Sequence, residues 1–164
     1  MVQVLHLVAS CLIVGIAHTA KDDCQVQTNA DAWASITGPD GGKYLLQKST
    51  SSDAKDCFYV TVPKDKTTKP AEYTYGFKEG NEWTTLQGTV DGVGDQIKAK
   101  EDGKELTATL LYSDNKNCEV TLLPDGNVEY WKHDSASDSG LTCCDKIFGE
   151  KTKDKKVKNL QENC

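Results

Sequence analysis

Six cysteines follow residue 23, and this even set constrains the fold of the chain more than any other feature. They are Cys24, Cys57, Cys118, Cys143, Cys144 and Cys164. In an oxidising compartment such a set predicts three disulfides, although the spacing alone leaves their pairing open. A zinc site is not expected, because the chain has no two Cys-x-x-Cys pairs at zinc-finger distance and only three histidines.

The N-terminal segment predicts export from the cell. Residues from Val2 to Ala20 form an apolar run that is closed by small residues, which is the pattern of a secretory signal peptide. We therefore expect residues 1–20 to be a signal peptide, with Ala17 as an alternative last residue, and residues 21–164 to form one secreted domain. No other segment of the sequence is apolar enough to span a bilayer.

Charge and composition narrow the function. The net charge is −6 and the pI is about 5.0. An acidic chain does not favour nucleic acid or anionic membranes as partners. Enzyme activity is not expected either, since no nucleophile has an obvious base. His133, beside Asp134, is expected at the surface. No metal or cofactor is expected, and we expect a monomer.

Turn residues divide most of the chain into eight segments with the composition of strands. The segments are Lys43–Thr50, Cys57–Val62, Glu72–Lys78, Glu82–Val90, Gln96–Glu101, Lys104–Tyr112, Cys118–Leu123 and Asn127–Lys132. Asp102-Gly103 and Pro124-Asp125-Gly126 predict tight turns between neighbouring strands. Short strands at this spacing favour an all-β, eight-stranded antiparallel barrel, whose interior has room for one small ligand.

Two helical segments flank the predicted barrel. A single turn of helix is expected around Asp31-Ala32-Trp33. The tail from Cys144 to Leu160 is expected to begin as a helix and to continue as an exposed, lysine-rich segment. In a barrel of this size the tail helix must pack outside, because the interior is too narrow for it.

Strand alternation suggests where two acidic side chains point. Glu119 lies on the opposite face of its strand from Cys118, and Glu129 shares a face with Trp131. If Cys118 bonds to a cysteine at the start of the tail helix, Cys118 faces outward and Glu119 faces the interior. If Glu129 and Trp131 also face inward, the interior holds two carboxylates and an indole.

This constellation is suited to a cation. Two buried like charges are costly unless a cation pairs with them, and an aromatic ring adds cation–π attraction. A protonated amine satisfies both requirements. The alternative is that Glu119 and Glu129 face water, or pair with Lys98 or Lys132.

The same residues resemble a known motif. The chain carries Cys118-Glu119-Val120, eight residues, Glu129-Tyr130-Trp131, eleven residues and then Cys143. This string is similar to the biogenic-amine-binding motif of tick salivary lipocalins, from which it departs by Glu for Asp at 119 and Tyr for Leu at 130. The Cys143-Cys144 pair and the terminal Cys164 resemble the soft-tick branch of that family.

The resemblance implies a fold, a disulfide pattern and a ligand. The fold is a lipocalin barrel, and the disulfides are Cys24–Cys143, Cys57–Cys164 and Cys118–Cys144. The implied function is to bind and sequester histamine or serotonin at the feeding site, which suppresses inflammation and haemostasis. Glu119, Glu129 and Trp131 are the candidate ligand-binding residues. Asp40, in Gly38-Pro39-Asp40-Gly41-Gly42, is a further candidate at the barrel mouth, with an ordinary turn role as the alternative.

Other functions remain open at this level. The same superfamily implies an eicosanoid scavenger or a complement-binding protein, and Lys48 or Lys98 would then meet a lipid carboxylate. A third alternative is a protein-binding module that acts through the polar segments Ser49–Lys55 and Pro63–Pro70. The sequence does not decide which amine is bound, or whether there is one site or two.

Overall fold

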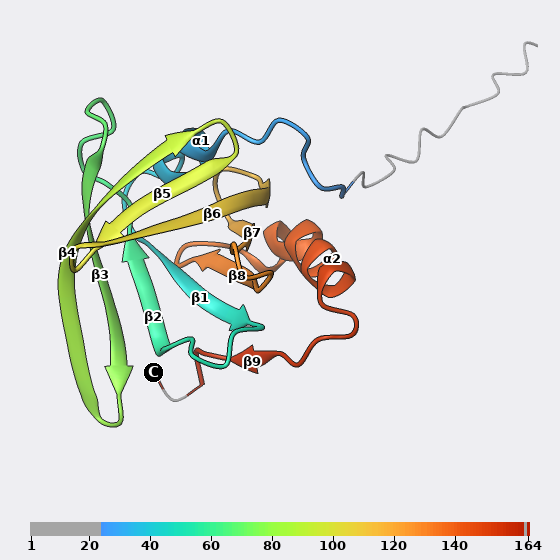
Figure 1. Ribbon diagram of the computed structural model, residues 1–164. Helices are drawn as coiled ribbons and strands as arrows, with labels where there is room; N and C mark the ends of the chain where they lie inside the picture. Colours follow the sequence, from blue (N-terminus) through green and yellow to red (C-terminus); the bar gives the residue numbers. More distant parts are fainter. Residues whose placement is uncertain (1–23, 163) are drawn as a thin grey trace, which may run out of the picture.

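Eight antiparallel strands wind into a closed barrel in the computed structural model, which describes residues 24–162 and residue 164 (Figure 1). The strands are β1 (Lys43–Ser49), β2 (Asp56–Thr61), β3 (Ala71–Glu79), β4 (Glu82–Val93), β5 (Gln96–Glu101), β6 (Lys104–Ser113), β7 (Cys118–Leu122) and β8 (Val128–His133). The predicted eight-stranded fold is confirmed, and each strand lies within a few residues of its expected range. The expected signal peptide lies outside the described residues.

Short turns set the order of the strands. Consecutive strands pair from β2 to β8, and β1 closes the barrel by pairing with both β8 and β2. Asp102 (φ 48°) and Gly103 (φ 75°) provide the left-handed conformations of a two-residue hairpin between β5 and β6. Between β7 and β8, the backbone N–H of Leu123 donates to the Asn127 carbonyl at 2.8 Å. Both predicted turns are therefore confirmed.

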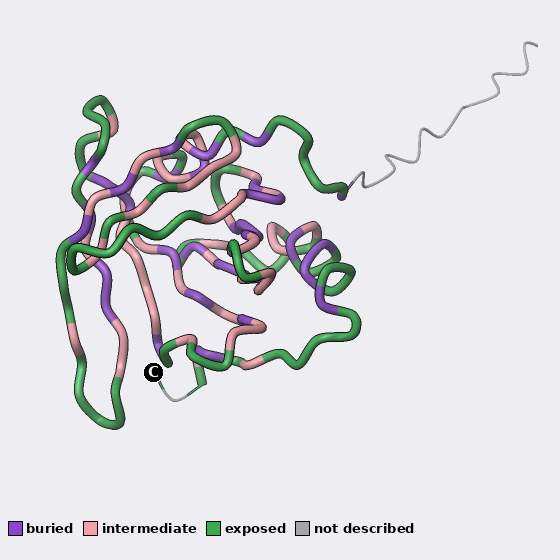
Figure 2. The backbone as a smooth tube through the Cα atoms, viewed as in Figure 1, coloured by how far each residue is buried: buried purple, intermediate pink, exposed green. Residues whose placement is uncertain are grey.

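Helix α2 (Thr142–Lys151) packs outside the barrel on β7 and β8, after a 3-10 turn, η1 (Asp138–Leu141). Val120 and Tyr130 point outward and join Ile147 and Phe148 of α2 in one buried cluster. Figure 2 shows buried residues gathered along α2, β7 and β8, whereas the far end of the β3–β4 hairpin is exposed. The outward face of β7 and β8 is thus fixed by the helix that covers it.

Helix α1 (Ala32–Thr37) lies against β4 and β5 at one end of the barrel. The Asp31 carboxylate caps it by accepting a hydrogen bond from the Ala34 N–H at 3.0 Å. The contact with β4 depends on Gly92, because a Cβ at this position would lie only 2.3 Å from the Trp33 nitrogen. Ile36 of α1 then faces the barrel interior.

Three disulfides tie the ends of the chain to this frame. They are Cys24–Cys143, Cys57–Cys164 and Cys118–Cys144, the pattern that the family resemblance implied. Cys24–Cys143 fixes the described N-terminal segment to α2, and Cys57–Cys164 fixes the C-terminal residue to β2. Among the described residues no helix is long and apolar enough to cross a membrane.

The end of the tail differs from its expected exposed state. Residues 153–157 are exposed as predicted, but Lys158–Asn159 form a short strand, β9, that pairs with β1. Leu160 is buried beside Trp131, and its N–H donates to the Gln47 carbonyl at 2.9 Å. The expectation of an exposed end was wrong because the lysine-rich composition concealed an apolar anchor next to the last cysteine.

The surface position expected for His133 was also wrong. Its side chain is buried beneath the loop that precedes β1. Nε2 lies 2.9 Å from the Gly41 carbonyl oxygen, and Nδ1 lies 2.8 Å from Ser135 Oγ. His133 therefore holds this loop against the end of β8.

Two glycine substitutions test the close approach of α1 to β4. Gly92→Ala should lower the free energy of unfolding by about 1–3 kcal/mol, because its methyl group would overlap the Trp33 backbone. Gly149→Ala, at an exposed position in α2 with no neighbour near the added carbon, should raise it by about 0.5–1 kcal/mol. Urea unfolding followed by tryptophan fluorescence measures both. Equal stabilities of Gly92→Ala and the wild type would contradict the contact.

Candidate ligand-binding site

A cavity of about 550 Å³ occupies the barrel interior. Ile36 of α1 lines one end of it. At the other end the rim is formed by Asp53 and Lys55 of the β1–β2 loop, Glu105 of β6 and Asp125 of the β7–β8 turn, all of them exposed. The volume lies within the range of roughly 300–1,000 Å³ that is typical of small-molecule sites.

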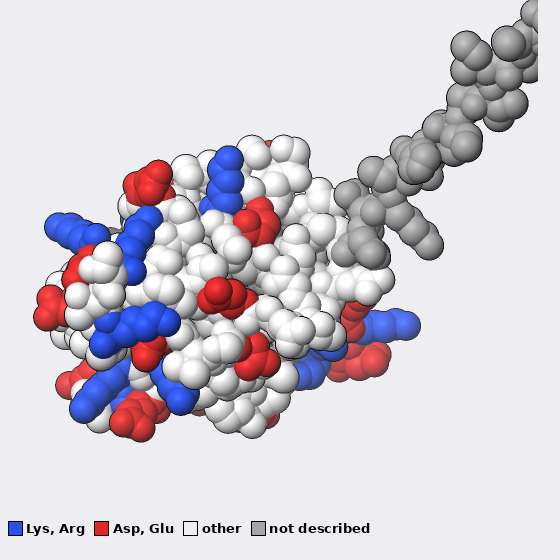
Figure 3. Space-filling view, turned by 90° about the horizontal axis from the view of Figure 1, so that it is seen from above, with Lys and Arg blue, Asp and Glu red and all other residues white. Residues whose placement is uncertain are grey.

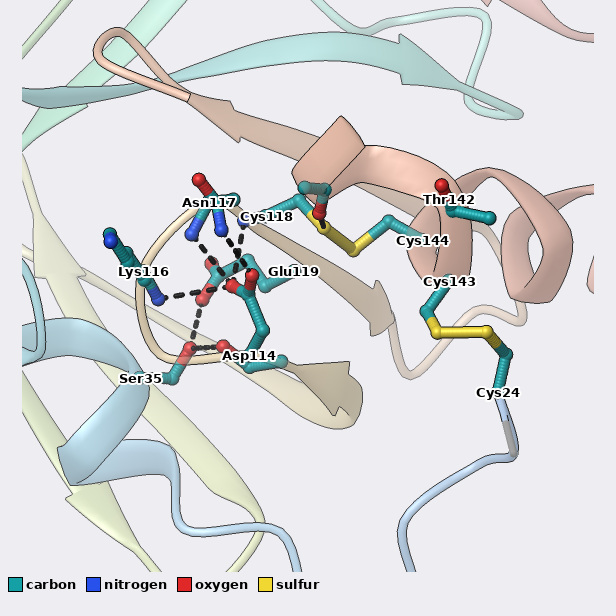
Figure 4. Close-up of a disulfide and its surroundings, with 12 residues drawn as sticks. Cys24, Ser35, Asp114, Lys116, Asn117, Cys118, Glu119, Thr142, Cys143 and Cys144 are labelled. Carbon is teal, nitrogen blue, oxygen red and sulfur yellow. Dashed lines mark hydrogen bonds between the residues drawn. A yellow bond between two sulfur atoms is a disulfide. The ribbon is translucent and has the colours of Figure 1, made fainter. Parts of the chain in front are cut away.

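Glu119 lies deep in this cavity. Glu119 is only 7% exposed, and its Oε2 accepts a hydrogen bond of 2.5 Å from Ser35 Oγ of α1 (Figure 4). Ser35 Oγ also lies 2.7 Å from Ser113 Oγ. Burial raises the pKa of Glu119 from 4.5 to about 7, and the Ser35 hydrogen bond offsets part of this rise.

The loop before β7 positions Glu119. Asp114 accepts hydrogen bonds from the backbone N–H groups of Lys116, Asn117 and Cys118 at 2.6–3.1 Å (Figure 4). Cys118 is then bonded to Cys144, so that its side chain faces α2. Because neighbouring residues of a strand point in opposite directions, the next side chain, Glu119, enters the barrel.

Glu129 and Trp131 line the same cavity from β8. Trp131 Nε1 donates to Glu129 Oε2 at 3.2 Å. Burial raises the pKa of Glu129 to about 7; the hydrogen bond from Trp131 lowers this pKa, and the charge of Glu119 raises it. Glu119, Glu129 and Trp131 therefore share the inner face, which is the conditional arrangement that strand alternation allowed.

Thr121 lies between the two carboxyl groups and was not singled out in the sequence. It faces Glu129 across the β7–β8 pair, lines the cavity and is 2% exposed. Its hydroxyl is buried without a hydrogen-bond partner among the described residues. Buried hydroxyl groups are normally paired, so this one is available to a ligand.

A third acid, Glu101, enters the cavity from β5 and was also missed. It accepts a hydrogen bond from the Tyr73 hydroxyl of β3. Burial raises the pKa of Glu101, and the Tyr73 hydrogen bond lowers it. Because Glu101 ends a strand beside the predicted Asp-Gly turn, its sequence context resembles that of an ordinary hairpin charge.

The remaining candidates lie outside the cavity lining. Asp40 is fully exposed, with Oδ1 3.4 Å from Lys66 Nζ. Lys98 is exposed on β5, and Lys48 Nζ lies 5.7 Å from the Tyr130 ring centroid on the side of α2. Lys132, an alternative partner for the acids, lies 3.8 Å from Asp138 Oδ1.

On the face seen in Figure 3, charge is mixed rather than concentrated. Seen from above, lysines and acidic residues are interspersed around a large uncharged area (Figure 3). Within the described ranges no group of three or more His, Cys, Asp or Glu side chains is arranged to hold a metal ion. The concentrated charge that the site offers is therefore the carboxyl pair inside the barrel.

A closed antiparallel barrel with an internal cavity and an external C-terminal helix defines a lipocalin-type binding protein. The sequence matches the family described as tick histamine binding protein over residues 20–164. The chain belongs to this family, and its relatives place it in the soft-tick branch.

Two relatives support this assignment, and a more distant structure shares the fold alone. Moubatin of Ornithodoros moubata is 34% identical over 139 residues, which cover 81% of this chain and 79% of moubatin. A crystal structure of AM182 in complex with serotonin superposes with a TM-score of 0.75 and 32% identity, over 85% of this chain and 95% of AM182. Insecticyanin from the tobacco hornworm Manduca sexta shares the fold. It superposes with a TM-score of 0.60 and 12% identity, over 84% of this chain and 83% of insecticyanin.

The raised pKa of Glu119 predicts that the free protein loses stability as the pH rises. The unfolded chain releases this proton near pH 4.5 and the folded chain near pH 7, so the cost of folding grows between these values. A shift of this size corresponds to on the order of 3 kcal/mol. Unfolding free energies at pH 5 and pH 8 should differ less in Glu119→Gln than in the wild type. An identical pH dependence in the two proteins would show that Glu119 is solvated.

Proposed function

We propose that the chain is a secreted salivary lipocalin that binds and sequesters a host biogenic amine, histamine or serotonin. Sequestration would suppress inflammation and haemostasis at the feeding site. Residues 1–20 would direct secretion and residues 21–164 would act as a monomer. Binding needs no reaction and no cofactor, because a closed barrel that captures the amine is sufficient.

The observation that carries this proposal is the carboxyl pair in the cavity, the buried Glu119 and the partly buried Glu129. Both carboxyl groups pay a desolvation penalty in the free protein, and an ammonium group between them would offset it. The unpaired Thr121 hydroxyl supplies an acceptor at the same level. The Trp131 indole, 9% exposed, adds an aromatic wall for the ring of the ligand.

The relatives support the same class of ligand. The family is described by histamine binding, and AM182 was crystallised with serotonin. The chain retains an acid at position 119 and the Glu129–Trp131 pair on the inner face of the barrel. A carboxylate lipid is less well supported, because neither Lys48 nor Lys98 lines the cavity.

Calorimetric titration with histamine and serotonin tests the proposal. At pH 8, which is above the raised pKa of about 7 of each carboxyl group, we expect saturable binding of at least one amine. Glu119→Gln should weaken it at least tenfold, since a buried hydrogen bond to a charged group contributes about 1.5–3 kcal/mol. For serotonin, whose amine stays protonated, affinity should also fall as the pH is lowered below 7.

Asp40→Asn is the matched control, since it removes an acid outside the cavity lining and should leave the affinity unchanged. An absence of binding for both amines at pH 8 would exclude the proposal. A loss on Asp40→Asn equal to that on Glu119→Gln would place the amine outside the cavity, near the loop between α1 and β1.

A further inference from the structure

The cavity extends far beyond the carboxyl pair. In the β6–β7 strand pair, Glu119 lies opposite Ser113 of β6. Leu106 also lines the cavity and lies seven residues before Ser113 on β6. At about 3.3 Å per residue these levels are roughly 23 Å apart along the strand. Strands of a barrel are tilted by about 40°, so the depth along the barrel axis is roughly 17 Å. A small amine held at Glu119 fills only the deep part.

The outer part of the cavity is apolar. The wall starts at Val90, which clusters with Ile36 of α1, and also includes Phe58, Val60, Ala99, Ala108 and, at the mouth, Leu106. Val90, Ala99 and Leu106 lie side by side in register on β4, β5 and β6. Leu106 is 48% exposed at the mouth although it faces the cavity. An apolar wall that stays open to water gains free energy when an apolar ligand covers it.

The charges along this path favour a cationic ligand over an anionic one. Lys55 is the one basic residue among the described residues of the lining, and its Nζ is 2.6 Å from Glu79 Oε1. Three acids, Asp53, Glu105 and Asp125, share the mouth with it. Inside, Glu101 already accepts the Tyr73 hydrogen bond. The deep carboxyl pair therefore remains the place for one positive head group.

We propose that the cavity also takes amphiphilic primary amines, which have one ammonium head and an apolar chain of lipid length. The head would lie between Glu119 and Glu129, and the chain would run along the Val90–Ala99–Leu106 wall to the mouth. This inference rests on the proposed function because the same carboxyl pair holds the head. It adds a class of ligand whose affinity comes mainly from the outer cavity.

Straight-chain amines test this inference directly. Butylamine, octylamine and dodecylamine are titrated at pH 8, below the concentrations at which they aggregate, alone and in competition with serotonin. Affinity should rise with chain length by up to about fourfold per methylene until the chain reaches the mouth. Dodecanol and dodecanoic acid should bind at least tenfold more weakly than dodecylamine. Equal affinity for butylamine and dodecylamine, or for dodecanoic acid and dodecylamine, would overturn the inference.

The outcomes separate this inference from the proposed function. Serotonin binding without a gain from the longer chain would overturn the inference alone. Dodecylamine binding without serotonin or histamine binding would support the inference and overturn the biogenic amine as ligand. Competition between dodecylamine and serotonin would support a shared head-group site, and simultaneous binding of the two would contradict it.

Variants at the mouth provide the structural test. Leu106→Gln, at a half-exposed position that tolerates a polar side chain, should weaken dodecylamine several-fold and leave serotonin and butylamine unchanged. Ala99→Phe fills the cavity at the same level and should weaken dodecylamine at least tenfold. Ala136→Phe, in the turn after β8, is the matched control outside the lining. Thermal unfolding checks that each variant folds. If Leu106→Gln and Ala99→Phe both fold and both keep the wild-type affinity for dodecylamine, the inference is overturned.

Discussion

The Cys118–Cys144 disulfide is the interaction on which the character of the cavity depends. It bonds one side of β7 to α2, and Val120 and Tyr130 pack beneath the helix on the same face. A strand has only two faces, so the residues between these positions must enter the barrel. The bond outside the barrel thus places a carboxyl group inside it, which hydrophobic burial alone would not do.

That placement carries a cost that a proton or a cationic ligand removes. Glu119 is buried and Glu129 is partly buried, and each has a pKa raised to about 7 by loss of solvent. The protein stabilises them with one hydrogen bond each, from Ser35 and from Trp131. The three disulfides and the closed sheet keep the protein folded despite this local cost in free energy. Because a bound cation would offset that cost, the empty site favours cation binding.

Burial and charge divide the cavity into two regions with different roles. The deep region, next to α1, is polar and acidic and selects for a positive head group. The outer region, along Val90, Ala99 and Leu106, is apolar and selects by shape and length. Leu160, just after β9, packs in one cluster with Trp131 and so supports the wall of the deep region. The barrel can therefore distinguish ligands by the charge of the head group and, separately, by the length and shape of the apolar chain.

Local patterns in the sequence determined the strands and the two tight turns, because these depend on composition and turn chemistry within a few residues. Alternation placed Glu119 on the face opposite Cys118, but which face is the inner one depended on the distant Cys118–Cys144 bond. The cysteine count predicted three disulfides, but their pairing came from resemblance. Tertiary structure alone decided that Leu160 and His133 are buried, that Asp40 stays outside, and that Thr121 and Glu101 join the cavity. These positions depend on contacts between distant segments, and no local period in the sequence records which segments meet.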